Sequence, residues 1–462
     1  MPRATDNDLP PRPAAPRSFA TAQVQAGFDP GVAENTAVPA IHQSNGFEFR
    51  SLAEARDLFA LRKDGNIYSR AANPTVLVFE RRVAELEGGI GAAGVASGQA
   101  AVAVALLALA KQGEHIVAAR QLYGGTVDLL QDTFADWGIE VTFVDQDDVD
   151  AWSAAVRPTT RALFAESISN PIAQVLDLGA VAAVARDAGV PLVIDNTVAT
   201  PYLQRAKDFG ADIVVHSATK FLGGHGTSLG GVVVDLGTFD FTADPERWPQ
   251  LTQTYRRVPD GSLVERFGET GSPYIALVKT KYVHDLGPSL SAFNAFQLLQ
   301  GLETLDLRMQ RHTESALAVA QFLDTHPAVA RVHHPGLETS PWHTQAQAYL
   351  PHGVSSVFAF DLPTTGDDEG DFRLVEEFIS RLQVIRLVAN IGDARSLVAH
   401  PASMTHSHMS RTQLSEAHIG PTTVRLSIGL EDARDIVDDL ARALERIGET
   451  AGRPRLAESV PR

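Results

Sequence analysis

The sequence predicts an α/β protein with a mostly parallel sheet that carries helices on both faces. Short apolar runs alternate with helical segments from residue 76 to residue 235, and this alternation is typical of such a sheet. The chain has 462 residues, more than one ordinary core requires, which predicts a second domain. Together the two observations favour a large α/β domain with a smaller domain attached.

Composition narrows the classes of partner. The chain is 44% hydrophobic and 21% charged, as globular proteins are, and its net charge is −17. An acidic chain disfavours nucleic acid and anionic membranes as partners. Cysteine is absent, and no long apolar run resembles a membrane span or signal segment, so we expect a cytoplasmic protein without disulfides. Residues 1–18, rich in Pro, Arg and Ala, are predicted to be a disordered tail.

The elements of the α/β region follow one another in a regular order. Apolar spacing and capping residues predict helices at Val76–Glu87, Ser97–Ala110, Val127–Trp137 and Val181–Ala188. Runs of apolar residues predict strands at His115–Ala119, Glu140–Val144, from Ala162, at Val190–Thr197 and at Ile213–Val215. The N-terminus of the helix after Ser97 offers N–H groups to an anion, although an isolated capped helix is more often structural.

Lys220 follows the last of these predicted strands. In open α/β sheets, ligands bind beyond the carboxyl ends of the strands. The hydroxyls of Ser217 and Thr219 can contact a phosphate, and the glycines that follow allow a flat ligand to approach the backbone. A lysine in this place can form a Schiff base with a carbonyl cofactor. A lone lysine before glycines is also typical of a flexible surface loop.

Asp195 ends the preceding strand. A buried carboxylate is costly without a cationic partner, and a protonated ring nitrogen is such a partner. Capping of the next helix is the alternative role for an aspartate there. Because Asp195 and Lys220 end successive strands of one parallel sheet, we expect them to lie at the same edge and to form one site.

Several separate motifs carry a resemblance to a known family. They are Gly65–Arg70 with Asn73–Thr75, Leu122–Thr126, Ser217–Gly226, Ala389–His406 and Val424–Asp432. From about residue 20 to residue 445 the chain resembles the Cys/Met-metabolism family of pyridoxal-phosphate enzymes, and within it most resembles the O-acetylhomoserine sulfhydrylases. The resemblance implies fold type I, with a C-terminal domain of α+β type.

The resemblance also implies a role for each matching residue. Lys220 binds pyridoxal 5′-phosphate and acts as the catalytic base, and Tyr123 stacks on the cofactor ring and joins Lys220 as a catalytic residue. The other implied cofactor ligands are Tyr68, Arg70, Gly98, Gln99, Asn170, Asp195, Thr197, Ser217 and Thr219. Arg425 and Ser396 are implied to bind the α-carboxylate of the substrate. His400, His406 and His408 lack a completing ligand at suitable spacing, so no metal is expected.

The implied organisation has four parts. After the tail, residues 19–75 form an arm that carries Tyr68 and Arg70 to the site of a neighbouring subunit. Residues 76–288 form the cofactor-binding domain, with an insertion at 236–270. Residues 289–462 form the C-terminal domain, which begins after Pro288 with a strongly helical stretch from Ser291 to Leu323. A homodimer is then the minimal active unit, and a tetramer is implied.

The implied activity replaces the acetoxy group of O-acetylhomoserine with sulfide or methanethiol, giving homocysteine or methionine and acetate. A cystathionine γ-synthase and a methionine or cystathionine γ-lyase are the alternatives, because these branches share the residues above. The insertion and the motif Asn390–Leu397 resemble the sulfhydrylase branch specifically. A non-catalytic binding subunit is disfavoured, because Lys220, Asp195 and Tyr123 are all present.

Overall fold

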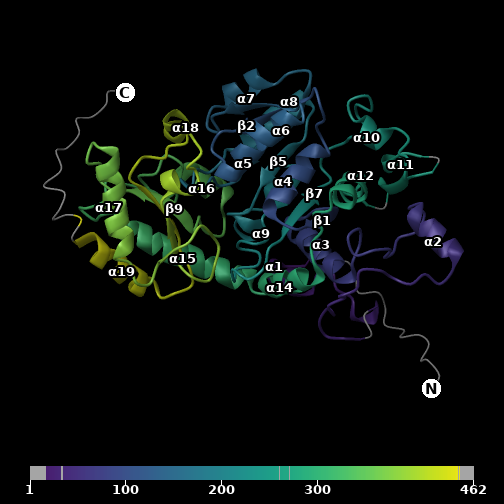
Figure 1. Cartoon of the computed structure of the whole chain (residues 1–462), viewed down its shortest axis with the longest axis horizontal. Helices are drawn as coiled ribbons and strands as arrows, with labels where there is room; N and C mark the ends of the chain where they lie inside the picture. The colour runs from purple at the N-terminus through teal and green to yellow at the C-terminus, as the bar shows by residue number, and fades with distance from the viewer. Residues whose placement is uncertain (1–16, 33–34, 260, 270, 446, 448–462) are drawn as a thin grey trace.

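The computed structural model describes residues 17–32, 35–259, 261–269, 271–445 and 447, which form two sheets surrounded by helices (Figure 1). The predicted tail lies outside the described residues except for residues 17 and 18. Helix α1 (Phe19–Gln25) begins directly after it. No helix of the described residues is long and apolar enough to cross a membrane.

The larger sheet has seven strands in the order β1-β7-β6-β5-β4-β2-β3. Their bounds are Gly91–Val95 (β1), His115–Ala119 (β2), Glu140–Val144 (β3), Thr160–Glu166 (β4), Leu192–Asp195 (β5), Ile213–His216 (β6) and Gly231–Asp235 (β7). Strands β3, β2, β4, β5 and β6 pair in parallel, whereas β7 is antiparallel to both β6 and β1. The mostly parallel sheet predicted from the sequence is confirmed.

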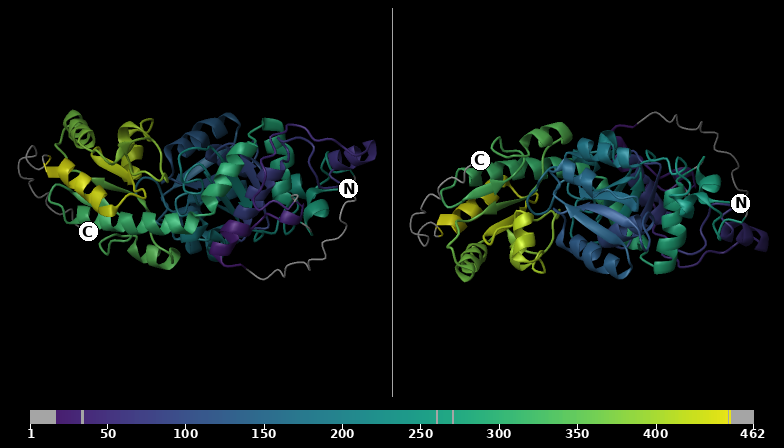
Figure 2. Two further views of the ribbon diagram at one scale, coloured as in Figure 1. Left: turned by 90° about the horizontal axis from the view of Figure 1, so that it is seen from below. Right: turned by 90° about the horizontal axis from the view of Figure 1, so that it is seen from above.

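Helices cover both faces of this sheet (Figures 1 and 2). Every residue of β2, β6 and β7 is buried, as expected for strands covered on both sides. The covering helices include α3 (Pro74–Glu87), α4 (Gly98–Leu107), α7 (Val149–Ala155) and α8 (Leu178–Ala188). The helix predicted over 127–137 is a continuous helical segment, α5 (Gly124–Asp128), a π-helical turn (Leu129–Thr133) and α6 (Phe134–Asp136).

The register of the parallel strands brings three carboxyl ends together. Glu166, the last residue of β4, pairs with Asp195, the last residue of β5. Asp195 in turn pairs with Val215 of β6, and Lys220 follows that strand by four residues. The predicted placement of Asp195 and Lys220 at one edge of the sheet therefore agrees with the strand pairing.

The C-terminal part contains a second, mostly antiparallel sheet in the order β10-β11-β12-β9-β8. Its strands are β8 (Arg331–His333), β9 (Val357–Asp361), β10 (Arg386–Leu387), β11 (Leu397–Ala399) and β12 (Thr423–Ser427). Helices α16 (His343–Tyr349), α17 (Asp368–Ser380), α18 (Arg411–Glu416) and α19 (Ala433–Glu445) accompany it. This is the smaller α+β domain that the sequence implied, although its exact limits remain a prediction.

The helical stretch predicted from Ser291 to Leu323 is confirmed, and it consists of two helices. Helix α14 (Ala292–Leu302) ends two residues before α15 (Leu305–Asp324) begins. At the break, Arg308 donates hydrogen bonds to the carbonyls of Gly301 and Phe221, at 2.7 and 2.8 Å. These contacts to another segment favour the break, and helical periodicity alone does not reveal them.

The N-terminal arm lies against the insertion of residues 236–270. Helix α2 (Leu52–Phe59) of the arm lies near α11 (Leu263–Phe267) of the insertion, whose other helix is α10 (Pro249–Thr252) (Figure 1). Arg266 Nε donates to the carbonyl of Leu61 at 2.5 Å. The insertion thus holds the arm of its own chain in place.

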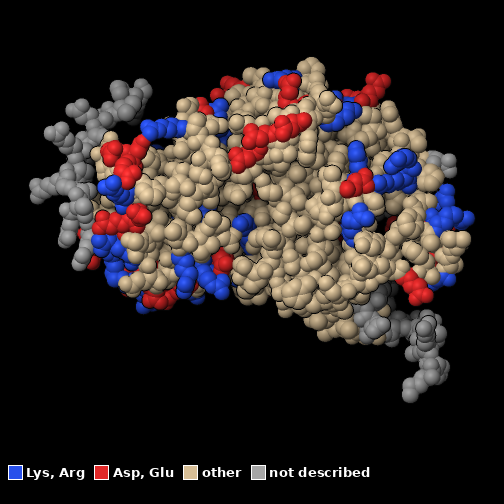
Figure 3. Space-filling view, viewed as in Figure 1, with Lys and Arg blue, Asp and Glu red and all other residues tan. Residues whose placement is uncertain are grey.

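Charged side chains are scattered over the surface. On the face drawn in Figure 3, acidic and basic groups are interspersed, and the described residues there form no continuous basic area. This distribution gives a polyanion no extended surface on that face.

A buried polar cluster connects α3 to the strands that lead into the site. Glu87 Oε1 lies 2.6 Å from His216 Nε2 and accepts a hydrogen bond from Asn196 Nδ2 at 3.1 Å. None of the three side chains is exposed. Because His216 and Asn196 adjoin the segments that carry Lys220 and Asp195, Glu87 fixes the base of the site.

We expect Glu87→Ala to lower the free energy of unfolding by about 2 kcal/mol or more, because it leaves the buried His216 Nε2 without its partner. Asn196 Nδ2 keeps its second bond, to the Gln204 carbonyl. Urea unfolding followed by tryptophan fluorescence measures this loss. Glu85→Ala on the same helix is the matched control, since Glu85 is partly exposed and only 3.9 Å from Arg17. Its loss should stay within about 0.5 kcal/mol. Equal losses in the two variants would contradict the role given to Glu87.

Candidate active site

A cavity of about 200 Å³ lies at the carboxyl edge of the larger sheet and reaches the second sheet. Its lining combines residues from both sheets and from the N-termini of two helices. Ten residues predicted from the sequence line it, namely Gly98, Gln99, Tyr123, Asn170, Asp195, Thr197, Ser217, Thr219, Lys220 and Arg425. Residues more than 300 positions apart in the chain thus meet in one place.

Lys220 extends into this cavity from the segment that follows β6. Its Nζ donates a hydrogen bond to Asn390 Oδ1 at 2.5 Å. Burial, together with the positive charge of Arg425, lowers the pKa of the Lys220 amine from 10.5 to about 8. A substantial fraction of the amine is therefore neutral near physiological pH, which suits both a nucleophile and a general base.

Two carboxyl groups lie side by side at the ends of β4 and β5. Burial raises the pKa of Glu166 well above its usual range, and the charge of Asp195 raises it further. The pKa of Asp195 is also raised by burial, but hydrogen bonds from Thr197 and the nearby His216 oppose this shift. The N–H of Thr197 donates to Asp195 Oδ1 at 3.0 Å. Asp195 is therefore the better-stabilised anion of the pair, and it is available to a cation in the cavity.

Arg425 closes the cavity from strand β12. It is almost fully buried, and its Nη2 donates to the carbonyl of Asn390 at 3.0 Å, while Nη1 lies 3.4 Å from Asn170 Oδ1. Its Nε is buried without a hydrogen-bond partner among the described residues. A buried guanidinium with an unused donor is a suitable partner for a ligand carboxylate.

The opposite end of the cavity has the features of an anion site. Ser97 caps helix α4 by accepting a hydrogen bond from Ala100 N, so the N–H groups of Gly98 and Gln99 remain outside the helical ladder. A Cβ on Gly98 would lie only 2.5 Å from the Cβ of Ser217. Glycine is therefore required where the helix meets the lysine segment.

Three predicted site residues do not line this cavity. Tyr68 is exposed, with the Arg70 guanidinium 5.6 Å from the centre of its ring, and Arg70 donates a hydrogen bond to the carbonyl of His284. Ser396 is buried, and its hydroxyl donates to Glu431 Oε2 at 2.8 Å. The hydroxyl of Ser396 is thus engaged away from Arg425, and the substrate role implied for it stays a prediction without support from this geometry.

Ten of the twenty residues that line the cavity were not identified from the sequence as site residues. Among these ten, Glu166 and Asn390 form hydrogen bonds with predicted site residues. Glu166 ends the strand next to Asp195, so the same argument from strand ends that selected Asp195 also points to Glu166. Asn390 comes from a loop of the second sheet, and its amide oxygen contacts the Lys220 amine. Its proximity to Lys220 depends on how the two parts of the chain pack together, which residue patterns do not encode.

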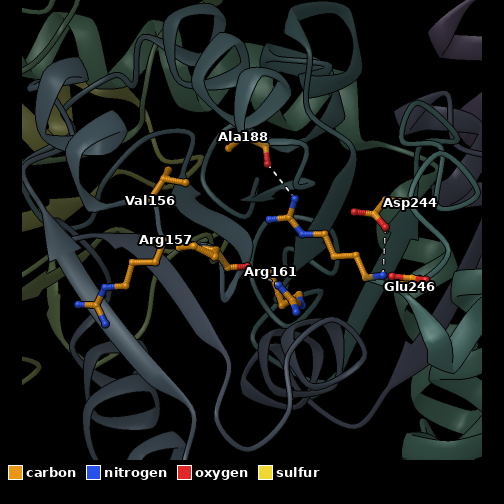
Figure 4. Close-up of a pocket in the computed structure, with 8 residues that line it drawn as sticks. Val156, Arg157, Arg161, Ala188, Asp244 and Glu246 are labelled. Carbon is orange, nitrogen blue, oxygen red and sulfur yellow. Dashed lines mark hydrogen bonds between the residues drawn. The ribbon is translucent and has the colours of Figure 1, made fainter.

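A more open hollow of about 530 Å³ lies elsewhere on the surface and is lined by Arg157, Arg161, Arg247, Asp244 and Glu246, among others (Figure 4). Its cationic groups have partners. Arg161 pairs with Glu114 and Arg157 with Glu140, and Arg247 donates to backbone carbonyls. These contacts leave no converging set of unpaired groups at this hollow, so it is not the candidate active site. The described residues also contain no group of three His, Cys, Asp or Glu side chains arranged to hold a metal ion.

The fold and the cavity define an α/β enzyme site in which a buried lysine faces a buried arginine across a pair of carboxyl groups. Residues 20–445 match the sequence model of the Cys/Met metabolism PLP-dependent enzymes. The chain belongs to this family.

Similar proteins give the same family and the same fold. The chain is 42% identical to the O-acetyl-L-homoserine sulfhydrylase of Leptospira meyeri, covering 94% of this chain and 98% of that one. It is 43% identical to the O-acetyl-L-homoserine sulfhydrylase of Corynebacterium glutamicum, over 91% and 95%. An O-acetylhomoserine (thiol)-lyase from Campylobacter jejuni, crystallised with N′-pyridoxyl-lysine-5′-monophosphate, superposes with a TM-score of 0.87 at 34% identity over 93% and 100%. The fold type I that the sequence implied is confirmed.

The lowered pKa of Lys220 gives a test on the protein without cofactor. Between the folded pKa of about 8 and the unfolded value of 10.5, the folded state binds fewer protons, so stability rises with pH across this window. Below it, burial of the charged amine costs stability. We therefore expect Lys220→Met to raise the free energy of unfolding at pH 7 by an amount on the order of 2 kcal/mol, and this gain should shrink by pH 9.5.

Urea unfolding at the two pH values measures the change. Lys111→Met is the matched control, because Lys111 is exposed and its replacement should have the same small effect at both. A gain for Lys220→Met that does not depend on pH would contradict the lowered pKa.

Proposed function

We propose that this chain is a pyridoxal-phosphate-dependent O-acetylhomoserine sulfhydrylase, which replaces the acetoxy group at Cγ of O-acetylhomoserine with sulfide or methanethiol. The products are homocysteine or methionine, and acetate. The observation that carries the proposal is the meeting of Lys220, Asp195, Tyr123 and Arg425 in one cavity, within a chain whose relatives are named O-acetyl-L-homoserine sulfhydrylase.

The residues of the cavity fit pyridoxal phosphate. The N-terminus of α4 at Gly98 and Gln99, with the segment of Ser217 and Thr219, would hold the phosphate. Asp195 would pair with the ring nitrogen, and Asn170 and Thr197 lie in the same cavity. The face of the ring would lie against Tyr123, and Lys220 would bind its carbonyl carbon. When bound, the group supplies a carbonyl for the lysine and an aromatic ring that accepts electrons from the Cα–H bond of the substrate.

The protein side chains perform the remaining tasks. The guanidinium of Arg425 binds the α-carboxylate of the substrate and so orients its Cα–H bond. Lys220 Nζ removes the proton from Cα, and its pKa of about 8 suits a general base near neutral pH. In the net reaction the bond between Cγ and the acetate oxygen breaks, and a bond between Cγ and sulfur forms.

The choice between branches of the family rests on particular features. A cystathionine γ-lyase from Lactobacillus plantarum also superposes, with a TM-score of 0.78 at 30% identity, so the general fold does not separate the branches. The motif Asn390–Leu397 favours the sulfhydrylase branch, and two of its residues, Asn390 and Ile391, line the cavity. The higher TM-score of the O-acetylhomoserine (thiol)-lyase supports the same choice.

The proposed enzyme acts in the cytoplasm as a homo-oligomer, with a dimer as its minimal active unit and a tetramer as its assembled form. The absence of cysteine supports a reducing compartment. Tyr68 and Arg70 lie outside the cavity of their own chain, which supports their proposed service to the site of a neighbouring copy. Arg70 can there bind the cofactor phosphate through its planar guanidinium.

A comparison of substrates tests the activity. With pyridoxal phosphate bound, we expect kcat/KM for O-acetylhomoserine and sulfide to exceed that for O-succinylhomoserine and cysteine by about tenfold or more. Release of 2-oxobutyrate from methionine or cystathionine should be slower still. Chromatography of homocysteine and cystathionine measures the products, and Lys220→Ala should abolish all of them. Faster formation of cystathionine or 2-oxobutyrate would assign the chain to the γ-synthase or γ-lyase branch.

Hybrid dimers test the shared site. Arg70→Ala and Lys220→Ala homodimers should each have little activity. A hybrid of the two, purified through two different tags, contains one site with both groups intact, so about half of the wild-type activity should return. A hybrid of Lys220→Ala with Arg425→Ala is the control, because both side chains line the cavity of one chain and no site is restored. Equal activity of the two hybrids would refute the exchange of arms.

A further inference from the structure

Glu166 is the one carboxyl of the cavity that the proposed reaction leaves without a task. Its side chain is 5% exposed, and each of its oxygens accepts a hydrogen bond from a backbone N–H. Oε1 lies 2.6 Å from the nitrogen of Tyr123, and Oε2 lies 3.2 Å from the nitrogen of Asn170. A single side chain thus holds two separate segments that bring ligand-facing groups into the cavity.

Each of these segments carries a group with a proposed contact to a ligand. Tyr123 immediately precedes helix α5. Glu166 accepts a hydrogen bond from the backbone N–H of Tyr123, next to the Cα that carries the aromatic side chain. The amide oxygen of Asn170 lies 3.4 Å from Nη1 of Arg425. Glu166 therefore connects the ring that faces the cofactor with the guanidinium that faces the substrate.

We propose that Glu166 is a positioning residue that remains uncharged in the active site and fixes Tyr123 and Asn170 for the cofactor and the substrate. The inference deepens the proposed function and rests on it, since the aromatic ring and the amide matter through the ligands that they contact. Glu166 itself takes no part in bond making or breaking.

The charges around Glu166 favour its neutral form. Burial and the facing Asp195 raise its pKa well above the usual range, and this outweighs the opposing effect of the two N–H groups. Tyr123 of α5, Lys220 after β6 and Arg425 of β12 are the other titratable groups that line the cavity. Two adjacent buried carboxyls do not both ionise readily, so Asp195 alone presents a negative charge, matched to one protonated ring nitrogen.

Three variants separate position from charge. Glu166→Gln carries no charge and keeps a carbonyl oxygen for the shorter bond, from the Tyr123 N–H, but its NH2 group offers no acceptor to the Asn170 N–H. Glu166→Asp keeps the acid but is one methylene shorter, so it does not reach both N–H groups. Asp235→Asn is the control, because Asp235 is a buried carboxyl with a raised pKa at the end of β7 and does not line the cavity.

The first measurement is the dissociation constant of pyridoxal phosphate, from quenching of tryptophan fluorescence in the cofactor-free protein. We expect Glu166→Asp to weaken binding about tenfold, and Glu166→Gln to stay within about threefold of wild type. Asp235→Asn should bind as wild type does. Unchanged binding by Glu166→Asp overturns the positioning role, and a loss for Glu166→Gln as large as that for Glu166→Asp overturns the uncharged state.

The second measurement is the melting temperature of the cofactor-free protein at pH 6 and pH 8. A carboxyl whose folded pKa is raised contributes stability at low pH and loses it as pH rises toward that pKa. Glu166→Gln should therefore lose less of its melting temperature between the two pH values than wild type does. An equal loss overturns the inference. This comparison of melting temperatures needs no ligand, so it tests the uncharged state of Glu166 independently of cofactor binding. Failure of the wild type to bind pyridoxal phosphate would overturn the proposed cofactor and not the uncharged state.

Discussion

The burial of one amine at the end of a parallel strand is the constraint on which the rest of the site depends. Lys220 emerges where β4, β5 and β6 end together, and Arg425 approaches it from the second sheet. Burial of the amine and, to a smaller extent, repulsion by the Arg425 charge lower the lysine pKa to about 8. Hydrogen bonds to Asn390 and Asn170 hold the two groups despite this repulsion. The same unfavourable burial that costs stability therefore produces an amine that is reactive near neutral pH.

Much of the fold followed from local patterns, because strands buried on both faces are continuous apolar runs and their bounds are easy to recognise. The predicted limits of β2 and β3 coincide with those found. Since parallel strands place their carboxyl ends at one edge of the sheet, the alternation of elements was enough to predict that Asp195 and Lys220 lie close together. The resemblance supplied what alternation did not, namely the meeting of Arg425, some 200 residues later in the chain, with that edge.

The features that escaped prediction all depend on tertiary contacts. Asn390 reaches Lys220 only because the second sheet packs against the first. Its motif marked the branch of the family, but not its contact with Lys220. The break between α14 and α15 is accompanied by hydrogen bonds from Arg308 to carbonyls of another segment, which helical spacing does not record. Glu166 is different, because it ends a strand as Asp195 does. Its place in the site follows from the strand pairing of Glu166 with Asp195, which places the two carboxyl groups next to each other.

The two sequence features that favoured the sulfhydrylase branch occupy different places in the structure. The motif Asn390–Leu397 contributes to the lining of the cavity, and Asn390 accepts a hydrogen bond from the Lys220 amine, so the motif can influence which leaving group and which nucleophile are accepted. The described residues of the insertion at 236–270 do not line the cavity. The insertion instead contacts the arm, through the hydrogen bond that Arg266 donates to the Leu61 carbonyl. Because that arm carries Tyr68 and Arg70, the insertion can affect a site only through the position of the arm. A difference in substrate between the branches should therefore result from differences in the loop that carries Asn390. A difference in how tightly the cofactor is retained should result from differences in the insertion.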